Sequence, residues 1–386
     1  MEEYSSVSFW GDKVKALFTG KTRVPFDIIL DIFTRLPAEY VIEFEHQRIP
    51  IRVFTTHPAF VEMHMKKSTP VIALLYLKEN FVCEEAHVHL IDEVSKNVAT
   101  KSFPRSKSGR FIFYGSYNGF LLFESKGTHV VIWNPSTGEK ECRQTPGEGY
   151  LLCGFYFHPA TKEYRVLFVS SDVVATRFCI TSLWSNYVRF CEFNQAPSLG
   201  KSPTVLNGVL HWMVRDARKS VKDLLMSQCS NAILLFDINS EVFSCMPHPG
   251  GQCDVGTHHD NMELMEMEGQ LCLCDSSSVK NLVIWMLDDY ANRIWVRKHD
   301  ILINPLLKFC GLKYGSGFQV DVGGFYMCNK ELLLRVSCSD LILYNLELNT
   351  PRRAGEFVGK DKRKNMSVVA VPHVNTVKKL KQKYNV

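Results

Sequence analysis

The spacing of hydrophobic positions divides the chain into two parts. Between residues 24 and 44 the apolar positions recur three or four residues apart, which is the spacing of one face of an α-helix. From about residue 111 the apolar residues form short runs separated by Gly, Asn, Pro and Ser, a pattern that predicts β-strands joined by turns. The sequence therefore predicts an α+β protein, mainly β, in which a small N-terminal helical module precedes an all-β domain.

Two short helices are predicted in the N-terminal part. Pro25 lies near the first helical position, where its missing N–H has no intrahelical partner to lose. Leu36-Pro37 ends the first helix, because proline disfavours helical geometry in the residue before it, and a second apolar helix follows. Such a pair buries little surface by itself, so its apolar stripe is expected to need a partner.

A motif of aliphatic residues, an aromatic residue and a polar turn recurs in the β-rich part. Its aromatic positions are Trp133, Phe236, Trp285 and Tyr344, with a weaker copy at 177–184. A turn of the Asn-Gly type precedes most copies, as at Asn118-Gly119, and this residue pair favours a tight hairpin. Repeats of about 50 residues built from strands and turns are typical of kelch-like propeller blades, which must stack or close to cover their apolar faces.

The sequence thus predicts a kelch-like propeller or an irregular β-repeat domain, with about five units of two to four strands each. The four aromatic residues are expected on the same strand of every unit. They and Trp212 are expected to pack between units rather than to hold a cofactor.

The segment from Val24 to Phe44 resembles the F-box of plant proteins. Its order of Val-Pro, an acidic residue, aliphatic pairs, Arg-Leu-Pro and a second apolar helix matches without a gap, and 57–64 is similar to the closing segment of that family. The resemblance implies that the module binds an SKP-type adaptor and, through it, cullin and RING subunits. The adaptor-binding residues that it implies are Val24, Pro25, Ile28, Ile29, Ile32, Phe33, Leu36, Pro37, Val41, Ile42 and Phe44.

The β-rich part resembles the F-box-associated domain of the same family. The segments 115–121 and 133–137 are similar to the opening of that domain, and 154–166, 205–212 and 236–240 follow in the family's order. The resemblance implies a substrate receptor of an SCF-type ubiquitin ligase, in which the β domain binds an unidentified target protein and the chain itself is not an enzyme.

These patterns together predict five segments along the chain. They are an N-terminal extension over 1–21, an F-box module over 22–65, a connecting segment over 66–110, an F-box-associated β-repeat domain over 111–350 and a basic tail over 351–386.

One stretch of the helical part departs from the family pattern. Pro50 falls where a third helix would run, Ile51 stands at the usual tryptophan position, and Glu43 and Glu45 replace residues that are usually basic. A second interpretation therefore stays open, a non-catalytic β-propeller interaction or scaffold protein with a degenerate F-box. A propeller enzyme with a site in its central channel is the third.

The residues that could carry chemistry form no catalytic or metal-binding pattern. Thirteen cysteines are scattered along the chain, which favours buried, reduced thiols and thus the nucleus or cytoplasm. Cys272 and Cys274 are expected on one face of a strand, with no second pair at zinc-ligand spacing. His258-His259-Asp260 is interpreted as a solvated loop rather than a metal site. No phosphate loop, nucleophile elbow or zinc-protease motif occurs, so we expect no catalytic residue and no cofactor.

Charge and hydropathy indicate which classes of partner are disfavoured. Ten Lys or Arg face two acidic residues between 352 and 386, and the run at 360–364 is either a nuclear-import signal or, by the favoured interpretation, a solvated loop. No basic stripe follows the body of the chain, which disfavours nucleic acid as a partner. No apolar run approaches the roughly 18 residues of a membrane helix, and the acidic start is unlike a signal peptide. We therefore expect no membrane partner.

Overall fold

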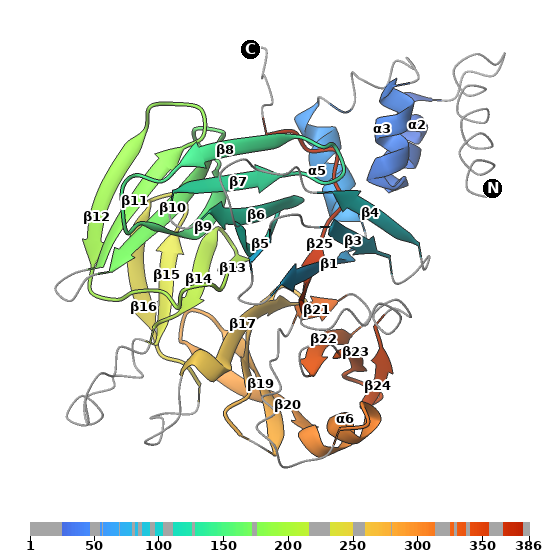
Figure 1. Cartoon of the computed structure of the whole chain (residues 1–386), viewed down its shortest axis with the longest axis vertical. Helices are drawn as coiled ribbons and strands as arrows, with labels where there is room; N and C mark the ends of the chain where they lie inside the picture. Colours follow the sequence, from blue (N-terminus) through green and yellow to red (C-terminus); the bar gives the residue numbers. More distant parts are fainter. Residues whose placement is uncertain are drawn as a thin grey trace.

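Three N-terminal helices and a β-propeller make up the computed structural model (Figure 1). The residues that the structure describes are 25–46, 55, 57–68, 70–78, 82–83, 87–92, 97–102, 111–125, 128–171, 176–215, 232–249, 259–278, 280–312, 325–327, 330–336, 340–354 and 366–380.

The helices are α2 (Phe26–Arg35), α3 (Ala38–His46) and α5 (Pro58–Lys67). Leu36 ends α2 in an extended conformation, with ψ of 145°, as expected for a residue that precedes proline. Pro58 begins α5, at the position where proline is best tolerated. The predicted helical pair is therefore confirmed, and α5 packs against α2 as a third helix.

The β domain is a propeller of six blades with four strands each. From the inner to the outer edge, the first blade contains β25 (Met366–His373), β1 (Val71–Lys78), β3 (His87–Ile91) and β4 (Val98–Ser102). The second contains β5 (Phe111–Tyr117), β6 (Phe120–Ser125), β7 (His129–Trp133) and β8 (Lys140–Gln144). The third contains β9 (Leu151–His158), β10 (Glu163–Ser171), β11 (Thr176–Ser182) and β12 (Val188–Phe193).

The other three blades repeat this order. The fourth contains β13 (Thr204–Leu206), β14 (Val209–Met213), β15 (Ile233–Asp237) and β16 (Val242–Met246). The fifth contains β17 (Met262–Met267), β18 (Gln270–Asp275), β19 (Asn281–Asp289) and β20 (Ile294–Leu302). The sixth contains β21 (Phe325–Met327), β22 (Glu331–Val336), β23 (Asp340–Asn345) and β24 (Thr350–Arg353). Three short elements, β2 (Val82–Cys83), η3 (His259–Asn261) and α6 (Ile303–Phe309), lie between them.

The ring closes in the first blade with a strand from near the C-terminus. β25 runs antiparallel to β1, from the pair Val71 and His373 to the pair Lys78 and Met366, and it contacts the inner strands of both neighbouring blades. The β domain therefore reaches beyond the predicted 111–350 at both ends, and the predicted count of about five units becomes six. The first blade was not predicted because its inner strand, β25, comes from the opposite end of the chain, so no local pattern marks it.

The four repeated aromatic residues lie on the third strand of their blades, as predicted. Trp133, Phe236 and Tyr344 each pair with the second residue of the neighbouring strand, so they occupy equivalent positions. Trp285 pairs with Leu273, the fourth residue of β18, and is therefore displaced by two residues along the equivalent strand.

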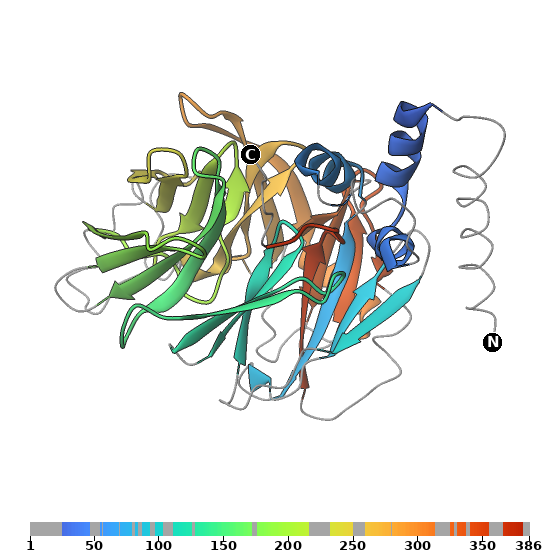
Figure 2. The same ribbon diagram turned by 90° about the horizontal axis from the view of Figure 1, so that it is seen from above.

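Tight turns gather at one face of the propeller, which we call the turn face. In the second to fifth blades it carries the turns between the first and second strands and between the third and fourth strands, and in the sixth blade it carries the turn between β23 and β24. Asn118 and Gly119 there have φ of 49° and 81°, which confirms the predicted hairpin turn. Because α5 leads into β1 from this face, the helices lie on the same side of the molecule as these turns (Figure 2).

Candidate adaptor surface and propeller pocket

Helix α2 has two different apolar faces. Ile29 and Phe33 are buried, and the ring of Phe33 meets that of Phe44 edge to face at 5.8 Å. Ile28 is 51% exposed, and Ile32, one turn further along, is half-buried. Residues four apart are neighbours on a helix surface, so Ile28 and Ile32 form an outward aliphatic pair that no described element covers fully.

The residues that the F-box resemblance implies are divided between this outer surface and the interior. Ile29, Phe33, Val41 and Phe44 are buried, whereas Ile32, Leu36 and Ile42 are half-buried. Pro25, Ile28 and Pro37 are exposed, and Val24 lies outside the described residues. The sequence predicted a single apolar stripe. In the structure most of its residues form a buried core, and a smaller group remains at the surface.

Helix α5 packs against α2 and shares one apolar core with α2 and α3. Phe60 and Val61 are buried in the same cluster as Phe33. His64 is completely buried, and its Nε2 lies 2.9 Å from the carbonyl oxygen of Leu36, the residue that ends α2. Burial lowers the pKa of His64, so its ring is neutral near pH 7. The resemblance pointed to this segment but not to the role of His64 in fixing the end of α2.

A segment that we call the C-terminal strap, residues 374–380, ties the helices to the propeller. Val377 is 1% exposed and belongs to the apolar core of the helical module. Lys379 Nζ lies 3.1 Å from the carboxylate of Glu45 on α3. This part of the chain belongs to the predicted basic tail over 351–386, and its packing on the helices and the propeller was not predicted. The missed signal is the pair of apolar residues Val377 and Leu380 on either side of Lys378 and Lys379.

The strap is held on the propeller by Asn134, in the Trp-Asn-Pro-Ser-Thr motif. Asn134 is fully buried, and its Nδ2 donates to the carbonyl oxygens of Thr376 at 3.0 Å and Lys378 at 2.8 Å. Its Oδ1 accepts from the backbone N–H of Ser136 at 2.8 Å, which shapes the turn. The motif therefore uses both ends of the amide group, one for its own turn and one for the strap.

Two further contacts hold the strap against the second and third blades. Gly119 has φ of 81°, and a Cβ there would collide with the side chain of Thr376. The ammonium of Lys378 lies 5.3 Å from the ring centroids of both Phe157 and Tyr164. Burial lowers the pKa of Lys378 to about 8.

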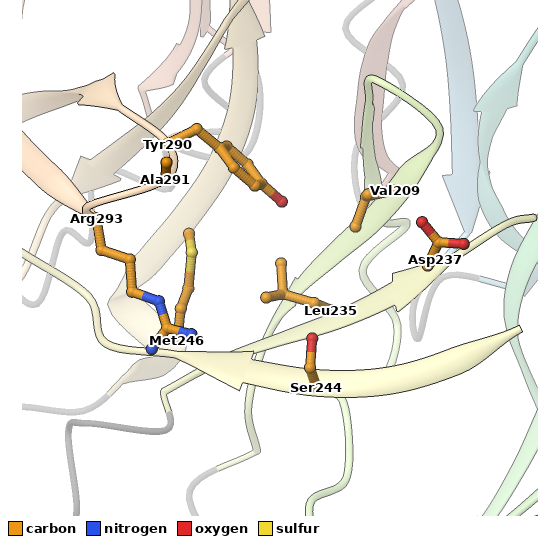
Figure 3. Close-up of a pocket in the computed structure, with 8 residues that line it drawn as sticks. All are labelled: Val209, Leu235, Asp237, Ser244, Met246, Tyr290, Ala291 and Arg293. Atoms are coloured by element: carbon orange, nitrogen blue, oxygen red, sulfur yellow. The ribbon is translucent and has the colours of Figure 1, made fainter. Parts of the chain in front are cut away.

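A half-open cavity of about 320 Å³ lies between the fourth blade and the β19–β20 turn of the fifth (Figure 3). It is lined by Val209, Leu235, Asp237, Ser244, Met246, Tyr290, Ala291 and Arg293. The first five come from β14, β15 and β16, and the last three come from the turn that faces them. A volume of this size is at the lower end for a ligand site in a protein.

The polar groups of this cavity differ in whether they have partners. The hydroxyl of Tyr290 points into it and lies 2.9 Å from Nε2 of His211, whose pKa is lowered by burial to about 4. Asp237 accepts from the N–H and the hydroxyl of Ser240 at 2.7 and 2.8 Å. Arg293 makes no hydrogen bond or ion pair with any residue that the structure describes. The cavity thus presents an unpaired cation beside an apolar floor.

The cysteine and histidine positions singled out in the sequence are mostly buried. Cys272 and Cys274 lie on one face of β18 in the same apolar cluster, as predicted, and burial raises the pKa of Cys272 to about 12. His259 is also buried, 5.1 Å from the ring of His248, so the expected solvated loop is corrected at that residue. In the described part of the chain, no group of three or more His, Cys, Asp or Glu could hold a metal ion.

Some predictions fall where the structure gives no answer. The departures at Pro50 and Ile51 and the basic run at 360–364 lie outside the described residues, as does His258. Among the helices that are described, none is long and apolar enough to cross a membrane.

Comparison with known proteins agrees with this architecture. Residues 72–374 match the model of the F-box associated beta propeller domain, and this range begins in β1 and ends just after β25. The chain therefore belongs to the family of plant F-box proteins that carry an F-box-associated domain.

Curated relatives come from Arabidopsis thaliana. The chain is 25% identical to F-box protein At3g07870 over 317 residues, which cover 73% of each chain. It is 22% identical to F-box protein CPR1 over 359 residues, 84% of this chain and 82% of that protein.

Solved structures resemble this chain only distantly. A streptogramin B lyase structure covers 73% of this chain at 9% identity with a TM-score of 0.40, and a complex of KlAtg21 with the coiled coil of AgAtg16 covers 72% at the same identity and TM-score. These likenesses carry no information about function.

Proposed function

We propose that the protein is the substrate receptor of an SCF-type ubiquitin ligase. The observation that carries the proposal is the aliphatic pair on α2, exposed at Ile28 and half-buried at Ile32, in a helical module mounted on an F-box-associated propeller. The module would bind an SKP-type adaptor and, through it, cullin and RING subunits. The propeller would hold the target protein.

In this role the chain performs no bond chemistry of its own. Its contribution is proximity, because one rigid body that binds both adaptor and target raises the effective concentration of target lysines near the ubiquitin-carrying enzyme. The strap supports this role, since Val377 and Lys379 couple the helices to the propeller and limit their relative movement. A kelch-like classification of the blades and residence in the nucleus or cytoplasm belong to the same proposal.

Co-elution tests the receptor function. The full chain is mixed with a purified SKP-type adaptor and then with a cullin–RING pair, and the mixture is separated by size-exclusion chromatography. The proposal expects a stable binary complex with the adaptor and, with the cullin–RING pair, a larger assembly. Elution of the chain apart from the adaptor at micromolar concentrations would contradict it.

The alternative function is a propeller scaffold whose helical module no longer binds an adaptor. It is favoured by one observation, that Glu45 of α3 is engaged with Lys379 of the same chain rather than free for a partner. The scaffold would bind the same target protein as the receptor but would not co-elute with the adaptor.

A further inference from the structure

The cavity beside Arg293 can be compared with the equivalent place between two other blades of the same propeller. The same place between the third and fourth blades is filled by Glu241, whose carboxylate accepts from the hydroxyls of Tyr156 and Tyr187, each at 2.5 Å. Arg165 completes this buried cluster through an ion pair with Glu241. Tyr187 also stacks with Arg165, whose guanidinium carbon lies 4.0 Å from the ring centroid.

The repeat allows each residue of this filled site to be matched to one in the cavity. Glu241 and Arg293 both end the turn between the third and fourth strands, with φ of 54° and 58°. In both turns the preceding aspartate, Asp237 or Asp289, accepts from the backbone N–H three residues later. Arg293 therefore stands where the neighbouring interface has a carboxylate.

The arginines of the filled site have smaller counterparts in the fourth blade. The N–H groups of Ile238 and Leu183 bind equivalent carbonyls, which aligns Leu235 with Ile180 and Asp237 with Ser182. Leu235 pairs with Ser244, whereas Ile180 pairs with Arg189, a second ion-pair partner of Glu241. In the same alignment Val209 stands where the third blade has Arg165. The cavity thus lies where shorter side chains replace the two arginines that fill the neighbouring interface.

We infer that this cavity is a docking site for a segment of the target protein that places an aromatic or aliphatic side chain beside a carboxylate. The side chain would lie over Leu235 and Met246, in the space left by Ser244, and the carboxylate would pair with Arg293. Arg293 is exposed, so a carboxylate can approach its guanidinium from solvent and form charge-assisted hydrogen bonds with it. This inference rests on the proposed receptor function and names the class of target.

The surroundings of the cavity fit a polypeptide. Three apolar side chains at its rim are unusually exposed, namely Val242 at 54%, Ile294 at 51% and Tyr290 at 41%. β16, which provides Ser244 and Met246, is the outermost strand of its blade. An exposed apolar rim next to a strand edge offers an extended segment both side-chain and backbone contacts.

The test uses the full chain and a library of fluorescent pentapeptides. Each peptide has one aromatic or aliphatic residue followed by glutamate, and its matched partner has glutamine in place of glutamate. Fluorescence anisotropy should show that the best glutamate peptides bind about 2- to 5-fold more tightly than their glutamine partners, because an exposed ion pair is worth up to about 1 kcal/mol.

Two variants remove the features that define the site. Arg293→Glu installs the carboxylate of the neighbouring interface and keeps the turn, since Glu241 already occupies the same conformation, and Ser244→Tyr fills the space beside Leu235 with a ring. Each should lower the affinity for the glutamate peptides several-fold. Lys298→Glu is the control, because it makes the same change of charge on β20 outside the cavity and should bind like the wild type.

Adaptor binding and thermal unfolding are measured for every variant, so that failure of this inference is separate from failure of the receptor function. Equal affinity for glutamate and glutamine peptides would overturn the inference. So would unchanged binding by folded Arg293→Glu and Ser244→Tyr proteins, or binding of small apolar carboxylates without any preference for peptides.

Discussion

Lys379 forms an ion pair with Glu45, and the two residues are 334 positions apart in the chain. This contact joins the C-terminal strap to helix α3, so the first and last described parts of the protein stabilise each other. The helical module is therefore not an independent appendage, and its folding is expected to depend on the end of the chain.

Val377 provides the first prediction. Val377→Asp places a carboxylate among Phe33, Phe44 and Phe60, and it should lower the free energy of unfolding of the helical module by more than about 2 kcal/mol. Hydrogen exchange should show faster exchange in α2 and α3 than in β14 and β15. Unchanged protection of α2 would show that the strap does not stabilise the helices.

Asn134 provides the second prediction, with a matched control in the sixth blade. Asn134→Asp removes two buried donors to the strap and should cost about 1–3 kcal/mol of stability. Asn345 occupies the equivalent position but acts only as an acceptor, for the N–H groups of Glu347 and Leu348. Asn345→Asp should therefore change the thermal stability very little. An equal loss of stability in the two variants would contradict the role of Asn134 in holding the strap.

His373 predicts how stability depends on pH. It lies on the closing strand β25, 1% exposed, and burial lowers its pKa to about 3. The unfolded chain takes up the proton near pH 6.5 whereas the folded chain does not, so stability is full above that pH and falls as pH drops towards 3. This single group contributes a slope of up to about 1.4 kcal/mol per pH unit.

Chemical denaturation between pH 7 and pH 4 measures that slope. His373→Gln should make the dependence shallower, and His211, whose pKa is lowered to about 4, should supply part of the slope that remains. A wild-type slope that His373→Gln does not reduce would contradict the assignment.

Local patterns in the sequence predict much of this fold. Asn118-Gly119 identifies a hairpin because both residues need positive φ, and Trp133, Phe236 and Tyr344 identify one strand of three blades because each copy has the same apolar neighbours. What the sequence does not predict is long-range pairing. β25 pairs with β1 although the two strands lie near opposite ends of the sequence. Neither strand is therefore recognised from the sequence as part of a blade.

The candidate sites show the same limit. Periodicity finds the apolar stripe of α2 but cannot separate Ile29, which faces Phe33 and Phe44, from the exposed Ile28. Ile29→Glu would for this reason disrupt the module itself, and it is no test of adaptor binding. The cavity beside Arg293 lies between two blades, and it is recognised only once Arg293 is aligned with Glu241 and Ser244 with Arg189.

The most direct test of the receptor function is the affinity of the full chain for an SKP-type adaptor, measured by surface plasmon resonance for the wild type, Ile28→Glu and Val188→Glu. Ile28 and Val188 are both about half exposed, one on α2 and the other on β12 of the propeller, so both changes are expected to leave the fold intact. Burying an isoleucine in an interface is worth about 1.5–3 kcal/mol. We predict micromolar or tighter binding by the wild type and by Val188→Glu, and binding at least about 10-fold weaker by Ile28→Glu. Absence of wild-type binding, or equal affinity of all three proteins, would contradict the account.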